Sequence, residues 1–84
     1  MAMYIISYDL IEDKDYNELI SELEERGATR VLSSVWFLSD NNTSCTRLLD
    51  QLSGYIDDDD HMFVVRATDM EGINLVNSPI SPVV

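Results

Sequence analysis

Cysteine, basic residues and long apolar runs are all scarce in this chain of 84 residues. A single cysteine, Cys45, makes neither an internal disulfide nor a structural zinc site, which needs four ligands of the Cys and His kind. No apolar run approaches the roughly 20 residues that a membrane-spanning helix needs, and the first residues lack the basic segment of a signal peptide. We therefore expect a reducing, cytoplasmic location and no membrane partner.

The shortage of basic residues gives the chain a strongly acidic balance. Five Lys and Arg stand against 16 Asp and Glu, for a formal net charge of -11 at pH 7. This balance argues against a generic nucleic-acid binder, which usually carries a basic surface. The hydrophobic fraction of 45% is typical of a globular domain rather than of disorder. A core built by so short a chain is modest, so help from a partner subunit is expected.

Residue spacing predicts four strands and two helices. The strands are expected at residues 3–8, 29–32, 35–39 and 62–67, and the helices at residues 16–26 and 45–56. For the first helix, Asp15 is the expected N-cap with Glu18 three residues later, and Gly27 is the expected stop. For the second helix, Asn42 or Thr43 is the expected N-cap. The order βαββαβ predicts an α+β, ferredoxin-like sandwich.

The end of the sequence differs in composition from the rest. Residues 72–84 carry no charge and contain both prolines, Pro79 and Pro82. Residues 72–76 have the composition of a short fifth strand, and the prolines favour an extended segment after them. We expect one domain over residues 1–77, followed by an extended tail over residues 78–84.

The predicted strands carry apolar side chains on both faces. In the first strand Tyr4, Ile6 and Tyr8 point one way, while Met3 and Ile5 point the other. Both helices of this fold cover the same face of the sheet, and an antiparallel sheet with one wet face normally alternates with polar residues. The second face therefore needs a cover. We expect a homodimer formed through this open sheet face.

Asp9 is the first candidate for chemistry, because it closes the first predicted strand. Mg²⁺ typically takes one or two protein carboxylates together with waters and phosphate oxygens, and a nearby two-fold axis would pair Asp9 with its copy. The alternative is that Asp9 only caps a turn. Arg30 in the second strand suits bidentate phosphate binding or a local ion pair. Ser34 suits a turn, and Trp36 suits the core or the dimer face.

Four consecutive aspartates, residues 57–60, precede His61, the only histidine. They lack the glycine and the glutamate of an EF-hand loop, and contiguous aspartates repel one another and normally stay solvated. We expect an exposed charged loop. His61 has no Ser or Cys at a spacing that suggests a catalytic triad.

Two stretches resemble a known family. Residues 4–10, Tyr-Ile-Ile-Ser-Tyr-Asp-Leu, are similar to the opening strand of the small CRISPR-associated adaptation proteins (the Cas-two family), which ends in Tyr-Asp. Residues 27–36 are similar to the Gly-x-x-Arg-(Val/Ile)-x-x-Ser-Val-Phe stretch of that family, with Trp36 in place of Phe. The virulence-associated protein D ribonucleases share this pattern. The resemblance extends over about residues 3–67.

The resemblance implies a ferredoxin-like homodimer in which the Asp at the end of the first strand, from both subunits, binds a metal for phosphodiester hydrolysis. That role falls on Asp9, with Mg²⁺ as the cofactor and RNA or DNA as the substrate. The other candidates lie at or near family positions associated with the site: Tyr8 and Ser34 for catalysis, and Lys14, Arg30 and Trp36 for substrate binding. In CRISPR adaptation such a dimer also serves as a scaffold for DNA and an integrase partner.

The acidic composition departs from this family. Lys14 stands alone where the family usually has several basic residues. Phosphate neutralisation supplies much of the affinity for nucleic acid, so the DNA-scaffold role loses support. Two functions remain: a metal-dependent endoribonuclease, and a catalytically inactive acidic module that binds a basic protein or imitates nucleic acid. A toxin or antitoxin component similar to virulence-associated protein D is a third interpretation.

Overall fold

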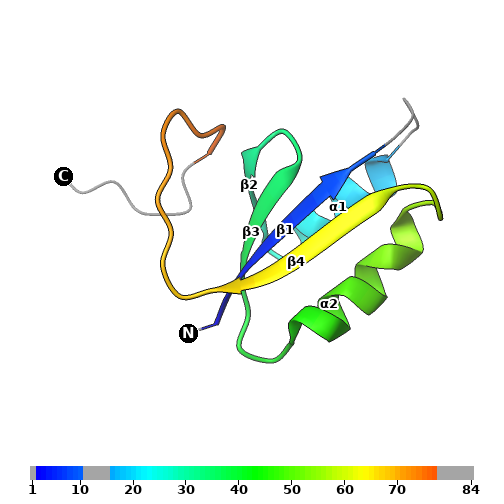
Figure 1. The fold of residues 1–84 in the computed structure, drawn as a ribbon, viewed down its shortest axis with the longest axis horizontal. Helices are drawn as coiled ribbons and strands as arrows, with labels where there is room; N and C mark the ends of the chain where they lie inside the picture. Colours follow the sequence, from blue (N-terminus) through cyan, green and yellow to red (C-terminus); the bar gives the residue numbers. More distant parts are fainter. Residues whose placement is uncertain (1, 11–15, 78–84) are drawn as a thin grey trace.

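A computed structural model describes residues 2–10 and 16–77 and contains one antiparallel four-stranded sheet with two α-helices (Figure 1). In chain order the elements are β1 (Met3–Asp9), α1 (Asn17–Glu25), β2 (Thr29–Leu32), β3 (Val35–Ser39), α2 (Cys45–Leu52), the 3₁₀ turn η1 (Ser53–Tyr55) and β4 (His61–Ala67). The strand order is β2-β3-β1-β4. This confirms the predicted ferredoxin-like α+β fold. None of the helices in the described ranges is long and apolar enough to cross a membrane.

Strand β1 lies in the centre of the sheet and divides its residues between two faces. Tyr4, Ile6 and Tyr8 are buried, whereas the intervening side chains are half-buried and Asp9 is exposed. Successive residues of a strand point to opposite faces, and residues paired across strands share a face. Ile5 pairs with both Phe37 and Val65, so these three lie on the face away from the core.

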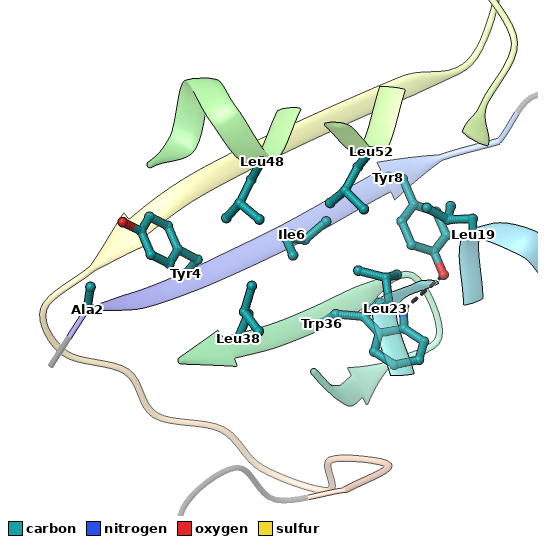
Figure 2. Packing of buried hydrophobic residues seen from close by; sticks show 10 residues of the cluster. All are labelled: Ala2, Tyr4, Ile6, Tyr8, Leu19, Leu23, Trp36, Leu38, Leu48 and Leu52. Carbon is teal, nitrogen blue, oxygen red and sulfur yellow. Dashed lines mark hydrogen bonds between the residues drawn. The ribbon is translucent and has the colours of Figure 1, made fainter. Parts of the chain in front are cut away.

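The core occupies the other face, beneath both helices. Its central members from the helices are Leu19, Leu23, Leu48 and Leu52, all 0% exposed, and they pack on the inward residues of β1 (Figure 2). Each pair is spaced by four residues and so lies on one helical stripe. Leu49, one position from that stripe, is 41% exposed. Both helices therefore cover a single face, and within residues 2–10 and 16–77 no helix lies on the opposite face of the sheet, called here the open face.

The ends of the helices differ in part from the sequence prediction. Gly27 follows α1 with φ of 80°, the left-handed conformation expected of a glycine stop. Helix α1 has Tyr16 as its N-cap; the expected cap, Asp15, lies outside the described residues. Helix α2 is capped by Ser44, whose side chain accepts a hydrogen bond from the Arg47 amide, and not by Asn42 or Thr43. The reason is a long-range contact. The Thr43 carbonyl accepts a hydrogen bond from the Tyr4 hydroxyl at 2.9 Å, so it is used outside the helix and the helix begins after it.

The segment after β4 returns to the other edge of the sheet (Figure 1). The Val76 amide donates to the Val31 carbonyl at 2.9 Å, and the Asn77 side chain donates to the Arg30 carbonyl at 3.0 Å. Residues 72–76, considered above as a fifth strand, are not assigned as one. Asn74 has φ of 53°, which interrupts the extended conformation that a strand requires. The proposed tail, residues 78–84, lies outside the described residues.

The aspartate loop before β4 is only partly solvated. Residues 57–59 are exposed, as expected, but Asp60 is buried with 9% exposure. Its carboxylate oxygen Oδ2 accepts hydrogen bonds from the Tyr16 hydroxyl at 2.8 Å and from the Asp57 amide at 2.9 Å. The expectation of four solvated aspartates is thus wrong for Asp60, which joins the start of α1 to the start of β4.

Asp60→Ala is expected to lower the free energy of unfolding by about 2–4 kcal/mol, because it leaves two donors of a buried carboxylate without their acceptor. Asp58→Ala removes an exposed carboxylate from the same loop and should change stability by less than about 0.5 kcal/mol. Urea unfolding followed by circular dichroism measures both. Equal effects of the two substitutions would contradict the structural role of Asp60.

Candidate functional site

Asp9 lies at the end of β1 and lines a shallow hollow of about 160 Å³. The other lining residues come from the ends of β1 and β4: Ser7, Tyr8, His61, Met62 and Phe63. The hollow has room for several water molecules. An exposed carboxylate beside such a space suits a hydrated divalent cation, so the residues present fit the metal that the sequence resemblance implies.

Tyr8 lies on the opposite face from Asp9, in the core. Its hydroxyl accepts a hydrogen bond from the Trp36 indole at 3.1 Å (Figure 2). Tyr8 and Trp36 are 7% and 2% exposed, so little of either side chain is available to a substrate in this conformation. The pair joins β1 to β3 directly behind the strand end that carries Asp9.

Arg30 is held against the same tryptophan. Its guanidinium carbon lies 5.4 Å from the centre of the Trp36 ring, and its Nε donates to the Ser33 carbonyl at 3.0 Å. Arg30 pairs with Trp36, and Trp36 pairs with Ile6, so Arg30 is two strands over and three positions along from Asp9. The spacing between strands and the rise per residue place the backbone of Arg30 about 14 Å from that of Asp9, and the Arg30 side chain lies on the other face. Within one chain the two residues do not meet at one phosphate.

Ser34 lies beside the end of β1. It lies in the turn between β2 and β3, as predicted, and its carbonyl accepts the Tyr8 amide at 3.1 Å. Lys14, the remaining candidate, lies outside the described residues. The sequence candidates therefore divide into Asp9 on the open face, Ser34 at the turn, and Tyr8, Trp36 and Arg30 on the helix side.

His61 is a neighbour of Asp9 that sequence reasoning did not connect with it. It opens β4 and pairs directly with Asp9 across the sheet. The βαββαβ order alone places the end of the first strand beside the start of the last, and this was the feature of the sequence from which the Asp9–His61 contact could have been predicted. The register that sets residue 61 opposite residue 9 depends on tertiary packing, which spacing along the chain does not fix.

A second group of carboxylates lies in the loop before β4. One oxygen each of Asp57, Asp59 and Asp60 lie within 4.8 Å of one another. The inner member of this group, Asp60, directs its carboxylate to Tyr16 and to the backbone of its own loop. These hydrogen bonds close the loop, and they account for the close approach of its carboxylates.

The open face of the sheet exposes large apolar side chains. Phe63 is 68% exposed, Leu32 45% and Val65 36%, and Ile5 and Phe37 between them are half-buried. Residues of the returning segment, among them Leu75, line a hollow with Val35 at the β2 end of this face. The apolar surface beside β1 and β4 therefore adjoins the Asp9 hollow.

The helix side has a different character. Helix α1 carries Glu18, Glu22, Glu24 and Glu25. Arg26, the residue after the helix, pairs with Glu22 at 3.2 Å. A groove between α1 and η1 is lined by three of these glutamates together with Asn17, Ser21 and Tyr55. The surface near α1 is thus rich in carboxylates, whereas most of the exposed side chains along the open face are apolar.

Comparison with known families gives a match that extends over most of the chain. Residues 1–72 match the family described as CRISPR associated protein Cas2. The matched range contains all four strands, both helices and the Asp9 hollow. The fold, the strand that ends in Tyr8-Asp9 and this match agree, and the chain belongs to the CRISPR-associated Cas2 family.

Proposed function

We propose that this protein is a homodimeric, metal-dependent endoribonuclease in which Asp9 binds the metal. The observation that carries the proposal is the position of Asp9, an exposed carboxylate beside a hollow at the end of the central strand, in a chain of the Cas2 family. A metal-bound water is a better nucleophile for a phosphodiester, and the metal charge stabilises the transition state.

The residues around Asp9 support this use. Tyr8 is fixed in the core by its bond to Trp36, so the backbone of the next residue is held in place. The net charge of -11 repels RNA at long range, but a cation held by Asp9 inverts the local charge where the phosphate must lie. Because Arg30 is two strands away on the other face, it would contact a phosphate other than the one at Asp9.

The apolar open face supports a dimer. Contiguous exposed apolar side chains in a small domain usually mark an interface, and this face has Phe63 as its most exposed aromatic residue. A second copy packed there would cover the apolar surface that adjoins Asp9. The two Asp9 carboxylates would then lie toward a shared axis, as the sequence resemblance implies.

The carboxylates of the helix side favour a second candidate, an acidic interaction module. The groove lined by Glu18, Glu22 and Glu25 is also lined by Tyr55, and aromatic rings attract cations. A lysine- or arginine-rich segment of a protein partner matches this chemistry. The module would act by occupying a basic surface and would need no catalysis.

Asp9→Asn is expected to reduce cleavage of single-stranded RNA in Mg²⁺ or Mn²⁺ by about 100-fold or more, because the amide removes the charge that holds the ion. The assay compares single-stranded RNA, single-stranded DNA and duplex DNA by gel electrophoresis. Asp69→Asn, an equal change at an exposed residue beyond β4, is the control and should cleave as the wild type does. Cleavage that survives Asp9→Asn but not Asp59→Asn would place the metal at the aspartate loop and overturn the assignment.

Phe63→Lys is expected to convert a wild-type dimer into a monomer at tens of micromolar protein, because it buries an unpaired charge in the apolar interface. Leu49→Lys is the matched control, since Leu49 is also an exposed apolar residue but lies on the helix side. Sedimentation equilibrium reports both masses. A wild-type protein that remains monomeric, or a dimer that is lost only in Leu49→Lys, would refute the open-face dimer.

The acidic module predicts binding of a fluorescent nonaarginine peptide that weakens steeply with added salt. The double substitution Glu18→Gln and Glu25→Gln should weaken this binding more than Asp69→Asn with Glu71→Gln, which makes the same change in net charge beyond β4. Fluorescence anisotropy measures both. Equal losses would mean that the peptide senses only overall charge, and the groove would not be its site.

A further inference from the structure

We propose that His61 is a second protein ligand at the Asp9 site, and that the pair selects a transition-metal ion such as Mn²⁺ or Zn²⁺ over Mg²⁺. The inference deepens the proposed function and rests on it in one respect, the use of Asp9 as a metal ligand. It assigns a role to the only histidine of the chain.

The register of the sheet carries the argument. Asp9 and His61 are direct partners in the β1–β4 ladder, so their side chains leave the same face of the sheet. Directly opposed residues have Cβ atoms roughly 4.5–5.5 Å apart, a separation from which a carboxylate and an imidazole can reach one ion. Both side chains are exposed and both line the same hollow.

The hydrogen bonds of Asp60 separate this pair from the aspartate loop. Asp60 directs its carboxylate to Tyr16 and α1, and His61, the next residue, pairs with Asp9 on the open side. The commitment of Asp60 to two hydrogen bonds leaves it unsuited as a third ligand. The site is thus formed by two strand ends, and its open positions are left for water, for phosphate oxygens or for ligands from a second copy.

The donor set determines which metal is favoured. Mg²⁺ prefers an all-oxygen shell and dehydrates reluctantly, whereas imidazole nitrogen is a common ligand of zinc and other transition metals. One carboxylate beside one imidazole therefore favours Mn²⁺ weakly and Zn²⁺ strongly over Mg²⁺. Zn–N and Zn–O bonds are about 2.0–2.2 Å long. Both side chains are exposed, so they are free to adopt the rotamers that a shared ion requires.

The test uses the imidazole resonances of the intact protein, which come from one residue because the chain has one histidine. Zn²⁺ is expected to shift the two ring carbon-bound proton signals of His61, and Mn²⁺ to broaden them, at concentrations where Mg²⁺ changes neither. In Asp9→Asn the same response should need at least about tenfold more metal, because one of the two ligands is weakened. In Asp59→Asn it should be unchanged.

Three results would overturn the inference: ring signals that ignore Zn²⁺ and Mn²⁺, a response that Asp9→Asn leaves intact, or a response that Asp59→Asn removes. Nuclear magnetic resonance of the wild type needs no substitution, so misfolding of a variant does not decide the outcome. A wild-type response that depends on Asp9 supports the pair even where no RNA is cleaved, and the cleavage proposal alone then fails. Cleavage that needs Asp9 with His61 signals that ignore every metal would refute the pair and leave the nuclease.

Discussion

The alternation of β1 is the constraint on which the rest of the structure depends. Because β1 has a neighbour on each side, every residue of it is committed to one of two faces. Tyr4, Ile6 and Tyr8 take the helix side and complete the core. The residues between them, ending at Asp9, are left on the open face. A shift of one residue would bury Asp9 and expose the core tyrosines, so folding and the position of the carboxylate depend on the same register.

The bond between Trp36 and Tyr8 shows how the family motifs contribute to this framework. The indole donates to the hydroxyl of a buried tyrosine, which satisfies a buried polar group and orients both rings. Arg30 stacks on the outer face of the same indole. Three residues that resemble site residues in sequence thus form a linked group on the helix side of the sheet. Asp9, the fourth, faces the open side.

Local spacing was sufficient to predict the elements and their order, because helix stripes and strand alternation are properties of neighbouring residues. It also placed Asp9 at a strand end and Gly27 at a helix stop. It failed where a distant residue decides the outcome. Ser44 rather than Thr43 caps α2 because Tyr4 binds the Thr43 carbonyl, and Asp60 is buried because Tyr16 reaches it from the start of α1. The pairing of His61 with Asp9 was missed for the same reason, since it exists only once β4 has its register.

The return of the chain after β4 has a consequence for assembly through sheet edges. Val76 and Asn77 occupy backbone acceptors on the outer side of β2, one of the two edge strands. The other edge, β4, has its outer side available within the described part of the chain. Unprotected edges on both sides would let sheets add to one another without end. A sheet with one edge occupied accepts a strand only at its other edge. If two copies pair through their free edges, neither has a further edge to offer, so the assembly stops at two and does not grow into a fibre.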